Sequence, residues 1–403
     1  REPSRDRSRA GRGRRLSVPS LTACPHAQRC AAPGPPPAHR HLAHHGVEPI
    51  AKAQVFPPGP RTTVVRPRSP MSRIPVPRRP SREDKPMALP DFLIIGAPKA
   101  GSTALHDALA QHPDLFLSDP KEPKFFLCDQ APPDPAHQRG PGDAHSAREW
   151  IWDRQEYESL FDAAPVGARR GESTPFYLWD TASHRRIHAL IPDVKMIAVI
   201  RDPIDRAYSN WTHLWCDGLE PESDFLSACD LEPARAEAGY APFWRYLETG
   251  LYGRQLQHLY SVFPKEQVFV LRYRQLIDAA RNTLDEIAAF LGVRAGLVSR
   301  VPRSNVSNWV PDRGVNRALR RVIRAGAVAG SHLPSQVWRE AQRPVLAALH
   351  RGGRRRPPLT VEQRTTLLPY FESDVALLGR LTGVDYADWL NETGRGAFIE
   401  RQT

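Results

Sequence analysis

The sequence predicts an α/β fold in which a doubly wound parallel sheet is flanked by helices and preceded by a disordered N-terminal tail. Three short apolar runs, at residues 92–95, 196–200 and 268–271, are each followed by a helical pattern. Continuous apolar runs are typical of strands buried on both faces of a parallel sheet, and strands that alternate with helices build such a sheet. The composition also changes sharply near residue 89, which indicates where the folded part begins.

The tail differs from the rest of the chain in charge and in proline content. The first 90 residues hold 18 of the 41 prolines and 18 Lys and Arg against 5 Asp and Glu, whereas the remainder has a net charge of −1. Such composition cannot bury enough apolar surface to fold. We therefore expect a disordered Pro/Arg-rich tail at 1–88 and one domain at 89–395, with no nucleic-acid partner for that domain. The first methionine is Met71, so it stays open whether the tail is native and functional.

Cysteine usage and hydropathy suggest a compartment. The five cysteines show no disulfide framework, and the only close pair, Cys24 and Cys30, lacks the second ligand pair of a metal site. No apolar run approaches the roughly 18 residues of a membrane span, and none forms a signal-peptide core. We expect a cytoplasmic protein.

The elements follow in chain order. Pro90 and Gly96 bound the first apolar run, and a helix is expected to begin at Ser102. A turn at 201–203 follows the second run, and Gly292 ends the helix after the third. The expected helices span 102–111, 203–215, 276–291, two within 315–350 that separate near Gly330 and Pro334, and 361–381.

The segment between the first strand and its helix is suited to bind an anion. Small residues let backbone N–H groups converge, the helix N-terminus adds partial positive charge, and Lys99 adds a full charge. A Walker A loop would place lysine directly after the second glycine, but here Ser102 follows Gly101. The pattern favours a related loop for a shorter, less charged group, with these candidate ligands: Pro98, Lys99, Ala100, Gly101, Ser102 and Thr103.

A second candidate anion site follows the strand at 196–200. Arg201 stands at the carboxyl end of that strand, where ligands collect in open α/β sheets. Ser209 lies two helical turns further on, so one phosphate could meet both side chains. Arg206 is ambiguous, because it could equally pair with a carboxylate near the helix start. Two such sites on neighbouring strand ends suggest a nucleotide with phosphates at both ends of its ribose.

In these two motifs the chain resembles the PAPS-dependent sulfotransferases, and in pattern a bacterial member close to the heparan-sulfate-type branch. Residues 96–103 resemble their 5'-phosphosulfate loop, and residues 201–209 resemble their 3'-phosphate motif. The resemblance implies a P-loop-like sheet and the donor 3'-phosphoadenosine-5'-phosphosulfate (PAPS). It also implies 3',5'-diphosphoadenosine (PAP) as product, with no metal. Lys99 would then steady the leaving phosphate oxygen.

The same resemblance assigns a base. Sulfuryl transfer needs a group that takes the acceptor's hydroxyl proton, and Glu122 matches the branch's catalytic glutamate in a Lys-Glu-x-x-Phe-Phe segment. The branch often has histidine where this chain has Lys124. Glu172 is the rival base, in a Gly-Glu-x-x-Pro segment that lines the acceptor cleft in relatives. The candidate acceptor contacts are Lys121, Lys124, Glu172 and Tyr177.

The expected function is transfer of a sulfuryl group from PAPS to an acceptor hydroxyl of a glycan, a glycolipid or a small alcohol or phenol. A lipid acceptor would bring the protein to a membrane surface. Two alternatives stay open. A P-loop nucleotide kinase or NTPase would carry a magnesium-binding carboxylate at a strand end, and a non-catalytic nucleotide-sensing adaptor would use the basic tail to bind nucleic acid or acidic lipid.

Overall fold

The computed structural model describes residues 88–302, 309–329, 334–351 and 353–392. These residues contain a five-stranded parallel sheet in the order β2-β3-β1-β4-β5, which confirms the predicted fold class. The strands are β1 (Phe92–Gly96), β2 (Leu115–Leu117), β3 (Arg169–Glu172), β4 (Lys195–Ile200) and β5 (Val268–Arg272). The predicted domain limits, 89 and 395, stay predictions.

The three strands expected from apolar runs are β1, β4 and β5, whereas β2 and β3 were not predicted. β2 has only three residues, and β3 reads Arg-Arg-Gly-Glu, which is neither apolar nor alternating. β3 becomes a strand because it lies between β2 and β1, where Gly171 pairs with Phe92. A Cβ at Gly171 would lie 2.2 Å from the Phe92 ring, so the flat packing there depends on glycine.

The helices follow the expected alternation with the strands, with some differences in their limits. The helix expected at 276–291 is two helices that part at Ala279, and the break expected near Gly330 falls outside the described residues. The helices are α1 (Ser102–Leu109), α2 (Asp143–Ala147), α3 (Arg154–Ser159), α4 (Thr181–Leu190), α5 (Pro203–Cys216), α6 (Phe225–Asp230), α7 (Glu232–Glu237), α8 (Tyr252–Val262), α9 (Tyr273–Asp278), α10 (Ala280–Leu291), α11 (Gly314–Ala329), α12 (Ser335–Leu349) and α13 (Val361–Thr382).

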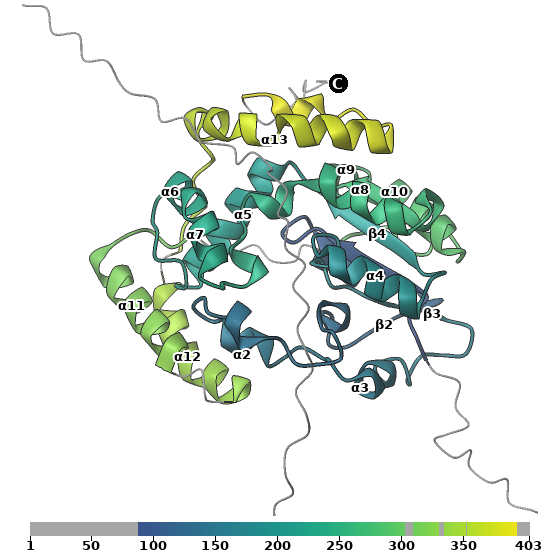
Figure 1. Cartoon of the computed structure of the whole chain (residues 1–403), viewed down its shortest axis with the longest axis horizontal. Coiled ribbons are helices and arrows are strands. Elements are labelled where there is room, and N and C mark those ends of the chain that lie inside the picture. Colours follow the sequence, from purple (N-terminus) through teal and green to yellow (C-terminus); the bar gives the residue numbers. More distant parts are fainter. Residues whose placement is uncertain (1–87, 303–308, 330–333, 352, 393–403) are drawn as a thin grey trace, which may run out of the picture. The chain divides into compact units, whose positions relative to one another are not determined.

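Helices bury both faces of the sheet. Phe92 and Ile94 of β1 pack in one cluster with residues of α1 and α10, while Leu93 and Ile95 pack in another with residues of α4, α5, α8 and α13. This is the alternation of a strand whose successive side chains point to opposite faces. Figure 1 shows α11 and α12 side by side, away from the sheet.

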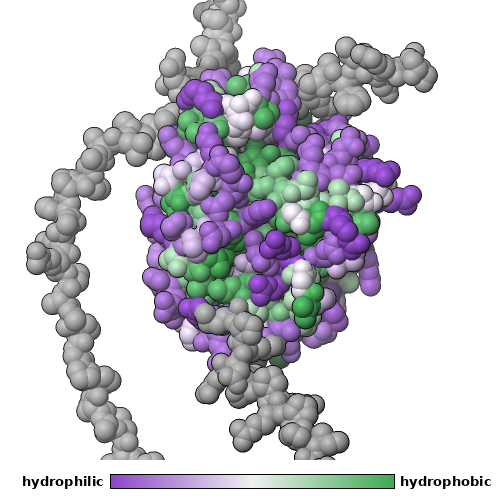
Figure 2. Space-filling view, turned by 90° about the vertical axis from the view of Figure 1, so that its right-hand side faces the viewer, coloured by the Kyte–Doolittle hydropathy of each residue, from purple (hydrophilic) through white to green (hydrophobic). Residues whose placement is uncertain are grey.

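The surface of the described part is mixed in polarity. Figure 2 shows hydrophobic residues interspersed among hydrophilic ones on the face at the right of Figure 1. None of the helices in the described ranges combines the length and the apolar character that a membrane span requires.

The order of the strands brings the two predicted anion sites together. β1 and β4 are parallel neighbours, with Leu93 paired to Met196, so their carboxyl ends reach the same edge of the sheet. The loop after β1 and the turn after β4 therefore start side by side, which is the arrangement that the sequence motifs required.

Candidate functional site

The loop that follows β1 has a geometry suited to an anion. Lys99 and Gly101 both have left-handed backbone conformations, with φ of 64° and 101°. Gly101 is the N-cap of α1, and no side chain caps that helix. Because the first N–H groups of a helix have no partner within the helix, the N-terminus of α1 offers donors and partial positive charge to a ligand.

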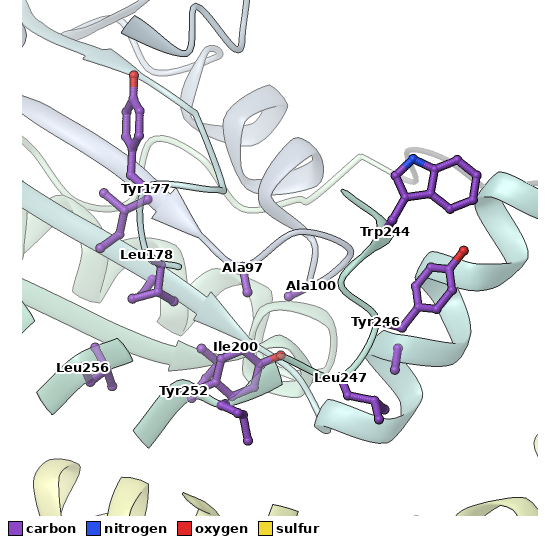
Figure 3. Packing of buried hydrophobic residues seen from close by; sticks show 14 of the residues in the cluster. Ala97, Ala100, Tyr177, Leu178, Ile200, Trp244, Tyr246, Leu247, Tyr252 and Leu256 are labelled. Carbon is purple, nitrogen blue, oxygen red and sulfur yellow. The ribbon is translucent and has the colours of Figure 1, made fainter. Parts of the chain in front are cut away.

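The core holds this loop in place. The Ala97 N–H donates to Val199 O at 2.6 Å, and the Ala100 N–H donates to Ala97 O at 3.1 Å. Figure 3 shows the small side chains of Ala97 and Ala100 within the packed hydrophobic cluster near Ile200. A Cβ on Gly101 would lie 2.7 Å from the Tyr273 ring, so the chain passes too close to α9 for any larger residue.

Lys99 lies half-buried at the centre of several charged groups. Burial lowers the pKa of its ammonium group, Asp217 and Glu122 raise that pKa, and Arg201 and Arg206 lower it further. The side chains that act on Lys99 come from the segment after β2 and from the start and the end of α5. The structure therefore brings Lys99, Glu122 and Arg201, three of the predicted site residues, into one region.

The turn after β4 is built differently. The Asp202 carboxylate caps α5, accepting from the N–H groups of Ile204 at 3.0 Å and Asp205 at 3.1 Å. Arg364 of α13 in turn donates to both Asp202 oxygens, at 3.2 and 2.5 Å. The N-terminus of α5 is thus already occupied by a carboxylate, and only side chains remain to bind a second anion there.

Arg201 and Ser209 share the solvent-facing side of α5. Along this otherwise buried helix and the turns at its ends, the half-exposed positions recur every four residues: Arg201, Asp205, Ser209, His213 and Asp217. Arg201 lies 3.7 Å from the Asp205 carboxylate and 5.3 Å above the Tyr273 ring. Both predicted 3'-phosphate ligands therefore point to the same side, as the eight-residue spacing predicted.

The predicted base lies on the segment after β2. Lys121 donates to Glu122 Oε1 at 2.8 Å, and about one third of the Glu122 side chain is exposed. Backbone contacts join this segment to the end of β3, since the Ser173 N–H donates to Lys121 O at 3.1 Å and the Lys124 N–H donates to Thr174 Oγ1 at 3.2 Å. Glu122 is accessible on a firmly held segment.

Lys124 lies beside the Glu122 segment. Its ammonium group donates to Ser146 Oγ at 3.3 Å and lies 5.4 Å from the centre of the Trp150 ring. Burial lowers its pKa, while Glu122 and Glu149 raise it. The role of Lys124 as an acceptor contact stays a prediction.

Glu172 and Tyr177 are fully buried. Tyr157 donates to Glu172 Oε1 at 3.4 Å, Glu172 Oε2 has no hydrogen-bond partner among the described residues, and burial raises the pKa of Glu172 to about 8. Tyr177 accepts a hydrogen bond from the Phe126 N–H at 3.2 Å within the core. Their role as acceptor contacts stays a prediction, against which this burial argues.

Several charged groups at the site were not predicted. Arg356 lies 4.7 Å above the Tyr208 ring, and its pKa is lowered by burial and by Arg201. It carries no local sequence signal, since it belongs to an Arg-rich loop 155 positions from Arg201 in the sequence. His213 and Asp217, 3.4 Å apart, could have been found by extending the four-residue spacing from Ser209.

Other features of the described ranges lie elsewhere or carry no metal signal. A cavity of about 390 Å³ lies where the strands begin, lined by Asp91, Arg169, Asp193 and Lys195 among others, and holds none of the predicted site residues. Within the described part, no three His, Cys, Asp or Glu side chains gather as metal ligands. The absence of a metal stays a prediction.

Comparison with known proteins agrees with this fold. The model of the sulfotransferase family matches residues 90–295. The chain is 29% identical over 237 residues to human heparan sulfate glucosamine 3-O-sulfotransferase 6, covering 58% of this chain and 60% of the relative. It is 26% identical over 275 residues to human carbohydrate sulfotransferase 15, covering 54% and 47%. The chain thus spans about half to three fifths of the length of these curated relatives.

A solved structure shows the same fold over a larger share of the chain. The sulfotransferase from Alicyclobacillus acidocaldarius aligns with a TM-score of 0.58 and 27% identity, covering 75% of this chain and all of that one. The matched residues include both strand–helix junctions and the Glu122 segment. This chain belongs to the sulfotransferase family.

Proposed function

We propose that the chain transfers a sulfuryl group from PAPS to an acceptor hydroxyl. The observation that carries the proposal is the pairing of two cationic sites at adjacent strand ends, one built on an uncapped helix N-terminus and one on the side chains of a capped helix. A donor with phosphates at its 5' and 3' positions needs two such sites at one sheet edge. Membership of the sulfotransferase family supports the same activity.

Each end of the donor has its own ligands. Residues 98–103 would hold the 5'-phosphosulfate through backbone N–H groups and the Lys99 ammonium group. Arg201 and Ser209 would hold the 3'-phosphate, with Arg356 close by to add charge. A nucleotide that lacks the 3'-phosphate would leave this second group of cations without an anion.

The transfer step uses two side chains. Glu122 takes the proton of the acceptor hydroxyl, whose oxygen attacks sulfur while the bond from sulfur to the 5'-phosphate oxygen breaks. Lys99 donates a hydrogen bond to that oxygen as negative charge develops on it, which stabilises the leaving PAP. The products are the sulfated acceptor and PAP, and the proton resides on Glu122 until solvent removes it.

Burial supports Glu122 over Glu172 as the base. Glu122 is accessible and hydrogen-bonded by Lys121, whereas Glu172 is fully enclosed and largely protonated at neutral pH, because its pKa is about 8. A protonated carboxyl group cannot accept a second proton. Replacing Glu122 by Gln should lower the transfer rate by about 10²–10⁴, whereas Glu172→Gln should lower it far less.

The acceptor is proposed as a hydroxyl-bearing glycan. Two relatives have names that describe them as acting on heparan sulfate glucosamine and on carbohydrate. An acceptor panel should therefore begin with glycosaminoglycan oligosaccharides, and it should include a glycolipid in vesicles and a simple phenol. Release of PAP from PAPS in the presence of each compound identifies the acceptor class.

Calorimetry tests the proposed donor without knowledge of the acceptor. We expect PAP to bind far more tightly than 5'-AMP or ATP, because PAP alone places a phosphate at both sites. Equal affinity for ATP, or a magnesium requirement for binding, would favour a kinase or NTPase instead. Binding of PAP without any PAPS turnover across the panel would favour a nucleotide-sensing adaptor.

A further inference from the structure

Arg206, in the first turns of α5, is a buried cation on which the Glu232 carboxylate acts at a distance, without a direct ion pair among the described residues. Its side chain is fully buried, and within the described ranges it forms no ion pair with a carboxylate. Its Nε has no hydrogen-bond partner there either. A charge buried in this way is costly unless it is compensated, so the position of Arg206 needs an explanation that α5 alone does not supply.

The guanidinium group contacts three separate segments. Nη1 lies 3.5 Å from Pro98 O, in the loop after β1, and 3.1 Å from Asn210 Oδ1. Nη2 donates to Tyr246 O. Figure 3 shows Tyr246 in the same packed cluster as Ala97 and Ala100 of that loop. Arg206 thus links the loop proposed to hold the 5'-phosphosulfate to the segment at 243–248.

Buried polar groups hold the 243–248 segment at other points too. Asn210 donates to Phe243 O at 2.8 Å, and the Glu232 carboxylate accepts from the N–H groups of Leu247 at 2.6 Å and Glu248 at 2.9 Å. Fixed carbonyl and amide groups at both ends make this a rigid segment.

The segment presents an aromatic side chain to the predicted site. The Phe243 ring lies 5.4 Å from the His213 ring and 6.0 Å from that of Phe176. His213 belongs to the exposed side of α5, and the charges of Lys99 and Glu122 act on it. Phe243 therefore packs against a residue of α5 on which the charge of the proposed base acts.

We propose that Arg206 is a positioning residue that fixes the loop at 98–103 relative to the segment at 243–248, and that the donor's phosphates add negative charge to that of Glu232 near its buried guanidinium group. This inference rests on the proposed function. Two effects follow from it. Loss of the charge weakens donor binding. Loss of the hydrogen bonds to Pro98 and Tyr246 means that donor binding at the 98–103 loop no longer stabilises the 243–248 segment.

Arg320 provides a matched control. It is also almost fully buried, at 1% exposure, and it donates to Trp215 O at 3.3 Å and to Val310 O at 2.8 Å. Unlike Arg206, it also lies within ion-pair distance of a carboxylate, at 3.5 Å from Asp312 Oδ1. Unlike Arg206, it contacts neither the donor loop nor the 243–248 segment. Arg320→Met therefore measures what removal of a buried arginine costs this domain in general, and thermal unfolding shows whether each variant is folded.

The experiment compares full-length wild type with Arg206→Met, Arg206→Lys and Arg320→Met. Calorimetry measures PAP affinity, and hydrogen exchange measures protection of the 243–248 amides with and without PAP. We expect Arg206→Met to weaken PAP binding about tenfold or more. We expect Arg206→Lys to recover much of that affinity, since it keeps the charge, but not the PAP-dependent protection of 243–248. Arg320→Met should retain both.

Three results would overturn the inference. Wild-type PAP affinity in a folded Arg206→Met variant would remove the proposed charge compensation, and equal losses in Arg320→Met would make the effect merely structural. Undiminished PAP-dependent protection in Arg206→Lys would remove the proposed link. If the wild type itself did not bind PAP, the proposed function would fail. The link between Arg206 and the 243–248 segment would still be tested separately, because without PAP the amides of Leu247 and Glu248 should exchange faster in Arg206→Lys than in the wild type.

Discussion

Two junctions of the same kind, each a buried parallel strand followed by a helix, differ in the groups that they offer to a ligand. At the β1–α1 junction the helix N-terminus has no side-chain cap, and Gly101 packs closely against the Tyr273 ring. At the β4–α5 junction Asp202 caps the helix, and Arg364 holds that carboxylate. The first junction offers backbone donors to an anion, whereas the second offers only side chains.

Under the proposed function, this difference lets one sheet edge distinguish the two ends of a single nucleotide. A helix N-terminus binds any compact anion that reaches it. An arginine and a serine on the exposed side of a capped helix bind only what extends to them. We expect the β1–α1 junction to supply most of the catalytic effect and the β4–α5 junction most of the selectivity for a 3'-phosphate.

The largest expected effect is at the first junction. Lys99→Ala should lower the rate of PAPS-dependent transfer by about 10² or more, because it removes one donor to the leaving oxygen. The measurement is PAP release with the best acceptor of the panel. Lys265→Ala is the control and should retain the rate, because the Lys265 ammonium group donates to Leu381 O and contacts none of the proposed site residues. An Ala variant at position 99 with the wild-type rate would show that the first junction is not catalytic.

The next effect concerns selectivity at the second junction. Arg201→Met should reduce the preference for PAP over 5'-AMP by about 10–100-fold, the range for loss of a charge-assisted hydrogen bond. Calorimetry with both nucleotides gives the ratio. Arg294→Met removes a surface arginine that is paired with Asp114 and should leave the ratio unchanged. A ratio unaffected by loss of Arg201 would mean that the 3'-phosphate binds elsewhere.

A third prediction separates the backbone of the first junction from its charge. Gly101→Ala should destabilise the fold by about 1–3 kcal/mol and weaken PAP binding, because φ is positive and the new Cβ would meet the Tyr273 ring. Gly167→Ala has a similar φ of +85° with nothing within 4 Å, so it isolates the cost of conformation alone. Similar urea unfolding curves for the two variants would contradict the close contact with Tyr273.

A fourth prediction is a pH dependence of stability that comes from Glu172. Burial raises the pKa of Glu172 in the fold from its ordinary value of 4.5 to about 8. Between these values the folded state binds more protons than the unfolded state, so the free energy of unfolding should decline as pH rises from about 4.5 to 8 and then level off.

Glu172→Gln should remove that decline. The melting temperature of the variant minus that of the wild type should therefore increase as pH rises from about 4.5 to 8. The exposed Glu266→Gln is the control and should follow the wild type. A constant difference in melting temperature between Glu172→Gln and wild type from pH 5 to pH 8 would show that Glu172 is ionised in the fold.

Much of the site was predictable because its signals are local. Lys99 and Gly101 follow an apolar run, and Ser209 of α5 comes eight residues after Arg201 at the end of β4, so short segments carry both motifs. Arg356, by contrast, reaches the second junction from a distant loop with no pattern of its own. The burial of Glu172 was equally hidden, since it follows from the position of β3 within the sheet rather than from its neighbours in the chain.

By itself, the sequence determined the fold class, the three strands that are continuous apolar runs, and the two candidate anion-binding motifs, because periodicity and turn chemistry act over a few residues. Only the tertiary structure decided that β2 and β3 complete the sheet, that Asp202 is held by Arg364, and that Arg206 joins the donor loop to the 243–248 segment. The physical reason is that burial and hydrogen-bond partners depend on which distant segments meet, and this information is spread over the whole chain.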